Sequence, residues 1–143
     1  MKTIFVKPNE VERKWFIIDA ENQILGRVAE KAASVVRGKY KACYTPHQEI
    51  GDYVVIINVD KIKVSGNKEQ DKLYYRHSGY PGGIKVENFT KVMAKKPEMP
   101  LEKAIKGMLP KGPLGNKLFR NVKIYAGAAH PHSAQKPEVL ELL

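Results

Sequence analysis

The run YVVIINV at residues 53–59 constrains the fold most, because it is apolar on almost every position instead of on alternate ones. A run of this kind is typical of a strand that is buried on both faces, as in a parallel sheet. A second apolar strand is predicted at residues 15–19 (WFIID). Between the two, residues 25–37 carry apolar side chains at helical spacing, and Gly38 follows where a helix would end. Strand, helix and buried strand predict a right-handed parallel βαβ unit.

The fold class that follows is α/β. We expect a single compact three-layer domain, with a small, largely parallel central sheet flanked by helices, extended basic loops and terminal extensions. We expect an extended arm at residues 1–14, an α/β domain at 15–127 and an extended tail at 128–143. The tail shows no sustained period, so it is expected to be extended or held by a partner.

Other elements follow from local patterns. Residues 60–66 are expected to form a short return, and residues 72–78 a strand that ends at the glycine loop 79–83. Residues 84–96 are ambiguous, although their second half favours a helix with Asn88 as its N-cap. The remaining expectations are a helix at 100–109, a short helix that starts at Pro113, and a last strand at 122–125.

Charge indicates the kind of partner. The chain has 143 residues and a formal net charge of +10, which favours nucleic acid or an anionic membrane. The longest aliphatic run, residues 54–57, is far too short to span a bilayer, and the start does not resemble a secretory signal. A single cysteine, Cys43, allows no intramolecular disulfide and suits a reducing compartment. We therefore expect a cytoplasmic protein that binds nucleic acid.

The segment 106–120 (KGMLPKGPLGNKLFR) is the strongest candidate for phosphate binding. Two prolines prevent one continuous helix, and three glycines permit sharp bends. Residues 103–137 hold seven Lys or Arg and no acid, although the chain has 15 acids. The cations predicted to contact RNA here are Lys106, Lys111, Lys117, Arg120 and Lys123.

Two further segments combine cations with rings, which bind phosphates and stack on unpaired bases. The first lies between residues 31 and 48, where no acid occurs, and the second precedes the glycine loop. Either Tyr74 or Tyr75 is expected to point into the core, and Arg27, Lys31, Lys91, Lys95 and Lys96 can equally be solvated surface. The predicted RNA contacts are Arg37, Lys39, Lys41, Tyr44, His47, Arg76, His77 and Tyr80, together with His130 and His132 of the tail.

No catalytic, cofactor or metal pattern emerges. The first βα turn has one glycine where a dinucleotide site needs three, and Pro113 stands where a phosphate loop needs its lysine. Cys43 has no recognisable base, and His130 and His132 alone make a poor zinc set. A nucleotide-binding metabolic α/β enzyme is the alternative function, because a βαβ unit permits it. A DNA-binding regulator is a third, although no helix-turn-helix or heptad pattern is present.

The motifs GDYVVIINVDKIKVSGNKEQDKLYYRHSGYPGGIK and KGMLPKGPLGNKLFRNVKIYAGAAHPH resemble the bacterial-type large-subunit ribosomal protein thirteen family, as does the opening WFIIDAENQILGRVAEKAASVVRGKYKACYTPH. The resemblance runs from about residue 15 to 137. It implies a compact α/β fold, a structural role and no enzymatic activity. It also implies partners: large-subunit ribosomal RNA, which the family binds early in assembly, and neighbouring ribosomal proteins, with its own messenger RNA as a further candidate. No homo-oligomer is expected. By family matching, segments 37–47, 74–83 and 106–120 face RNA.

Overall fold

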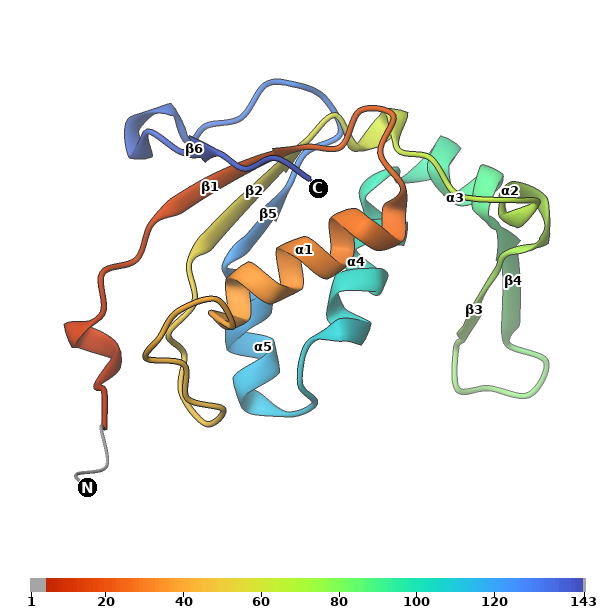
Figure 1. The fold of residues 1–143 in the computed structure, drawn as a ribbon. Coiled ribbons are helices and arrows are strands. Elements are labelled where there is room, and N and C mark those ends of the chain that lie inside the picture. Colours follow the sequence, from red (N-terminus) through yellow and green to blue (C-terminus); the bar gives the residue numbers. More distant parts are fainter. Residues whose placement is uncertain (1–4, 143) are drawn as a thin grey trace.

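The computed structural model describes residues 5–142, so residues 1–4 of the predicted arm lie outside it. Its central sheet contains four parallel strands in the order β5-β2-β1-β6. They are β1 (Trp15–Asp19), β2 (Tyr53–Ile57), β5 (Val122–Ile124) and the two-residue β6 (Glu138–Val139). Helices flank this sheet (Figure 1). The predicted α/β class with a largely parallel sheet is confirmed.

One face of the sheet forms the main core. The register places Phe16 and Ile18 of β1 beside Val54 and Ile56 of β2, and α1 (Leu25–Arg37) packs against this face. Helices α4 (Glu98–Met108) and α5 (Pro113–Arg120) complete the same core. α1 has the predicted bounds and ends at Gly38, which has a φ of 76° that favours glycine.

The other face of the sheet carries an aromatic layer. Trp15 and Tyr53 stack with ring centroids 4.5 Å apart, and His132 from the C-terminal segment stacks on Trp15 at 5.1 Å. Side chains of Val54, Val55 and Ile56 are therefore all 0% exposed, although successive residues point to opposite faces. Burial on both faces is the physical reason for the unbroken apolar run.

A β-hairpin stands to one side of this body (Figure 1). Its antiparallel strands are β3 (Leu73–His77) and β4 (Ile84–Asn88), flanked by α2 (Lys68–Asp71) and α3 (Phe89–Lys95). The ambiguous stretch is thus a strand followed by a helix. The predicted cap is confirmed, because the Asn88 side chain accepts a hydrogen bond from the Lys91 backbone N–H.

Element ends differ from expectation by a few residues. β2 stops at Ile57 because Asn58 has a left-handed φ of 56°, and a 3₁₀ turn follows at Val59–Lys61. α4 starts two residues earlier than expected, since Pro100 fits within a first turn. Two further 3₁₀ turns lie at Pro8–Glu10 and Ser133–Gln135. Among residues 5–142, no helix has the length and apolarity needed to cross a membrane.

Candidate nucleic-acid interface

The three segments expected to face RNA leave the body on a common side. The loop between α1 and β2, the turn between α4 and α5, and the loop of the β3–β4 hairpin all project toward the bottom of Figure 1. The first of these loops and α5 lead into the amino ends of β2 and β5. This amino edge is therefore the side on which the candidate interface is built.

The turn between α4 and α5 requires glycine at two positions. Gly112 has a φ of 102°, which L side chains rarely adopt, and a Cβ on Gly115 would lie 1.8 Å from the carbonyl oxygen of Pro110. Around this turn, four predicted cations are exposed, and none forms an ion pair within the described chain: Lys106, Lys111, Lys117 and Arg120. This turn thus presents positive charge to solvent, with no ion-pair partner among residues 5–142.

The loop after α1 contains both exposed and internal groups. Lys39 and His47 are exposed, Tyr44 is half-buried, and the Arg37 guanidinium lies 5.9 Å from the centre of the Tyr44 ring. The loop is anchored at Gly51, where a Cβ would lie 1.7 Å from the carbonyl oxygen of Val36. This loop offers two cations and two rings to a ligand.

Lys41 is placed differently from Lys39. Its Nζ donates hydrogen bonds to the Asp52 carboxylate at 2.8 Å, the Glu12 carbonyl at 3.0 Å and the Ile50 carbonyl at 3.1 Å. An ammonium group has three protons, so its donor capacity is used internally. The side chains of Lys41 and Asp52 are 15% and 0% exposed. The structure therefore gives Lys41 an internal bracing position instead of the exposed position expected from the sequence.

Acids on this edge are neutralised internally. Asp52 also accepts a hydrogen bond from the Lys14 backbone N–H at 2.8 Å. Glu49 pairs with the Arg13 guanidinium at 3.1 Å and accepts from the Asn121 side chain at 2.7 Å. The outward-facing cations of α5 and its preceding turn consequently meet no competing carboxylate from these two residues.

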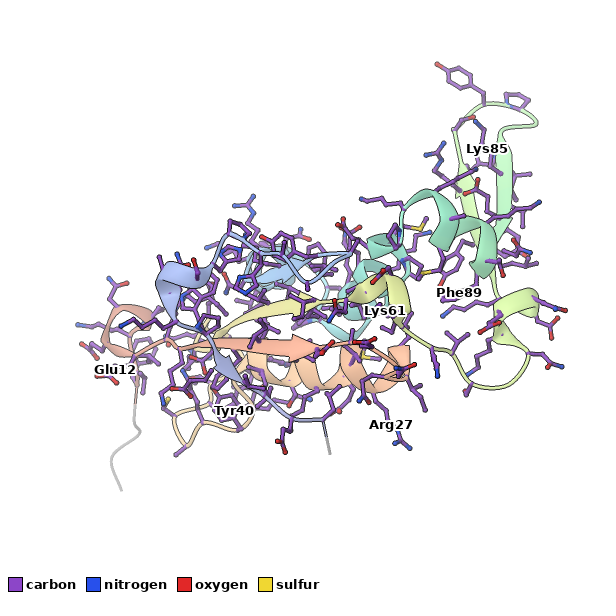
Figure 2. All side chains as sticks on the ribbon, turned by 90° about the horizontal axis from the view of Figure 1, so that it is seen from above. Glu12, Arg27, Tyr40, Lys61, Lys85 and Phe89 are labelled. Atoms are coloured by element: carbon purple, nitrogen blue, oxygen red, sulfur yellow. The ribbon has the colours of Figure 1, made fainter. Side chains whose placement is uncertain are left out.

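The β3–β4 hairpin carries the third predicted group. Arg76 and His77 are exposed, as is Tyr80 in the hairpin loop, with 76% of its surface accessible. His77 Nδ1 accepts a hydrogen bond from the Gly79 backbone N–H, which orients its ring. Figure 2 shows the hairpin that carries Lys85 standing beyond the helical body with side chains projecting from it. Tyr75 is 60% exposed and Tyr74 is 8% exposed, so Tyr74 is the inward member of the pair.

Lys123, His130 and His132 belong to a different surface. They lie with the aromatic layer on the sheet face opposite α1, where His130 stacks on His132 with centroids 6.3 Å apart. His132 Nε2 and the Tyr125 hydroxyl form a 2.7 Å hydrogen bond. Burial, followed by the nearby His130 and Lys123, lowers the pKa of His132. The two histidines therefore take part in packing the C-terminal segment onto the sheet.

The opposite, carboxyl edge of the sheet is where open α/β folds usually bind small ligands. Here Asp19, the last residue of β1, accepts hydrogen bonds from the Glu21 backbone N–H and the Asn58 side chain, both at 2.9 Å. These bonds lower the pKa of Asp19. The protein's own carboxylate thus occupies one backbone donor of the first βα turn and places negative charge there, which disfavours nucleotide phosphate binding.

The structure gives little support to a reactive cysteine or a metal site. Cys43 is half-buried, and no His, Asp or Glu side chain is recorded as its hydrogen-bond partner within residues 5–142. The same range holds no cluster of three or more His, Cys, Asp or Glu that could bind a metal ion.

Sequence patterns missed one group of residues altogether. A pocket between the hairpin and helices α3 and α4 is lined by Tyr74, Lys85, Lys95 and Lys103, beside the predicted Arg76. Strand alternation could have grouped Tyr74, Arg76 and Lys85, had residues 84–88 been identified as a strand. No local pattern could have added Lys103, which comes from another helix.

Comparison with known proteins gives a consistent result. The family described as ribosomal protein L13 matches residues 13–131. Proteins named large ribosomal subunit protein uL13 are 61% identical in Treponema denticola and 59% identical in Azoarcus sp. (strain BH72), each over 142 residues. Both alignments cover 99% of this chain and 100% of the relative. This chain therefore belongs to the ribosomal protein L13 family.

Proposed function

We propose that this protein is a structural constituent of the large ribosomal subunit, where it binds ribosomal RNA and supports early assembly in the cytoplasm. The names of its relatives identify them as large-subunit proteins. The observation that carries the RNA-binding part is the turn between α4 and α5, which presents exposed cations that form no ion pair within residues 5–142. We also propose a structural role without catalysis, which is supported by the family to which the chain belongs.

The residues that we assign to RNA contact share exposure or partial exposure and a charged or aromatic side chain. Cations supply salt-dependent phosphate affinity, while rings stack on unpaired bases. We assign Lys41 to bracing the loop, for the reasons given above. The proposed contacts are Arg37, Lys39, Tyr44, His47, Arg76, His77, Tyr80, Lys106, Lys111, Lys117, Arg120, Lys123, His130 and His132.

Neighbouring large-subunit proteins are proposed as further partners, and the protein's own messenger RNA remains a candidate. The division into arm, domain and tail also stays a prediction. Part of the predicted tail contacts the sheet, because β6 pairs with β1 and the Leu140 N–H donates to the Ile17 carbonyl.

A charge-neutralising variant tests the proposal. Lys111→Gln, Lys117→Gln and Arg120→Gln together should weaken binding to large-subunit RNA and reduce the slope of log affinity against log salt by about 2 to 3. The matched control changes the same charge elsewhere: Arg27→Gln, Lys31→Gln and Lys63→Gln, on α1 and at the carboxyl edge. It should bind almost as the wild type does.

Affinity and slope that stay unchanged in the first variant would contradict the assigned surface. The broader proposal is tested by sedimenting a cell lysate at moderate salt. We expect the protein to run with the large subunit in stoichiometric amount. A free pool with none in ribosomes would refute the ribosomal function.

A further inference from the structure

A pocket of about 220 Å³ lies between the β3–β4 hairpin and the helices beside it. One face of the hairpin forms one wall, because Tyr74 and Arg76 alternate along β3 and pair directly with Glu87 and Lys85 of β4. Lys95 and Lys103, from α3 and α4, contribute to the opposite wall. The pocket is therefore built from two separate parts of the chain.

The pairing of Arg76 with Lys85 is unfavourable in the protein alone. The two residues lie directly opposite each other in the antiparallel ladder, where like charges destabilise a sheet. Neither residue has an ion-pair partner within residues 5–142. An anion placed between the two side chains would remove this repulsion.

Tyr74 adds an unmet hydrogen-bond donor. Only 8% of the residue is exposed, and its hydroxyl has no hydrogen-bond partner in the described chain. Burial raises the pKa of this phenol, so it keeps its proton at neutral pH. Buried polar groups are nearly always paired, which makes an unpaired hydroxyl in a pocket wall an indication of a ligand. The ammonium groups of Lys72 and Lys103 lie over the Tyr74 ring, 5.5 Å and 5.2 Å from its centre.

The pocket has one carboxylate among its lining residues, Glu87, and this group pairs with Lys95. Lys95 lowers the pKa of Glu87 accordingly. Three lining cations remain without a carboxylate partner in the residues described: Arg76, Lys85 and Lys103. One carboxylate side chain of a protein partner could not balance the charge of these three cations. An RNA strand carries one negative charge on every phosphate, so its backbone could balance several cations in succession.

We propose that this pocket binds the phosphate backbone of an RNA strand, with the Tyr74 hydroxyl as a hydrogen-bond donor and Arg76, Lys85 and Lys103 as the balancing charges. The inference rests on the proposed RNA-binding function and adds a site to it. Tyr75 and Tyr80 on the same hairpin have exposed rings, which are suited to stacking on unpaired bases.

Two variants probe the site, with large-subunit RNA as the ligand. Tyr74→Phe keeps the ring under both ammonium groups and removes only the hydroxyl. It should reduce affinity about ten- to a hundredfold, as expected for one hydrogen bond to a charged group, while stability in urea stays the same or rises slightly. Lys103→Gln should weaken binding and reduce the salt slope by about 1. Lys63→Gln, which alters an exposed cation outside the pocket, is the matched control and should change neither quantity.

Acylation of lysines in the free protein and in its RNA complex gives a second measurement. Lys103 should become protected by RNA, whereas Lys63 should react equally in both states. Unchanged affinity in both pocket variants, with no protection of Lys103, would overturn the proposal, while weaker binding by the α5 triple variant would still support the RNA-binding function. Protection of Lys103 only in intact subunits would also overturn it and indicate an acidic protein segment as occupant. Failure of the wild type to bind RNA would refute both proposals.

Discussion

The buried pair of Lys41 and Asp52 gives the sharpest test of the distinction between bracing and RNA contact. We predict that Lys41→Met lowers the free energy of unfolding by about 3 to 4 kcal/mol at pH 7, without a comparable loss of RNA affinity. The variant leaves the Asp52 carboxylate, 0% exposed, with only the Lys14 backbone N–H as a hydrogen-bond donor.

Protonation of Asp52 sets the upper value of the predicted loss in free energy of unfolding. A stranded carboxylate can take up a proton, and for an ordinary Asp pKa of about 3.9 this costs about 4 kcal/mol at pH 7. Burial already raises the pKa of Asp52, and loss of Lys41 should raise it further. When the folded-state pKa lies above the unfolded value, the folded protein binds more protons than the unfolded protein at pH values between the two. The free energy of unfolding therefore rises as pH falls. The deficit of Lys41→Met should therefore shrink as pH falls from 7 to 5, by up to about 1.4 kcal/mol for each pH unit.

A double-mutant cycle isolates the interaction. Asp52→Asn keeps an acceptor for the Lys14 N–H but removes the charge, so it should cost about 2 to 3 kcal/mol. Combined with Lys41→Met it leaves no buried charge, and the total loss should fall short of the sum by about 2 kcal/mol or more. Urea unfolding measures all four proteins. Additive losses, or a Lys41→Met variant of normal stability with weakened RNA binding, would refute the bracing role.

Three further predictions concern local features. Gly51→Ala should destabilise the fold by about 3 kcal/mol, since the new Cβ would clash with the Val36 carbonyl oxygen. Gly26→Ala, where a Cβ meets no atom within 4 Å, should be neutral or stabilising. Equal effects of the two variants in urea unfolding would contradict this prediction. Asn88→Ala should cost about 1 kcal/mol through loss of the α3 cap and accelerate amide exchange in that helix, and unchanged exchange would argue against the cap. The lowered pKa of His132 means that folding favours its neutral form, so the free energy of unfolding should be highest above about pH 6.5 and decline below it. His132→Gln should flatten this pH profile in urea unfolding. A decline that persists in the variant would show that other groups cause the pH dependence.

Much of the fold could be predicted because its determinants are local. Helical spacing and a following glycine specify α1 and its end at Gly38, and the unbroken apolar run specifies a strand buried on both faces. Asn88 could be identified as an N-cap from its own side chain and the helical pattern after it. Each of these properties depends on backbone preferences and side-chain periodicity within a few residues. Such local properties can be predicted from the sequence.

Tertiary structure decided which cations are available to a ligand. Lys39 and Lys41 have the same chemistry and are two residues apart, yet only Lys41 is held by Asp52 and by the carbonyl of Glu12. The two-residue β6 similarly exists only because β1, more than one hundred residues earlier in the chain, supplies its partner.

The pocket at Tyr74 depends on the same kind of long-range contact. It needs Lys103 of α4 to lie over a ring of β3, and nothing near either residue in the sequence specifies that approach. Local sequence properties are sufficient to predict the α/β class, the main elements and a basic chain suited to RNA. Tertiary packing determines which charged side chains are paired inside the fold and which remain exposed. The reason is that an ion pair depends on distance in space and not on separation along the chain.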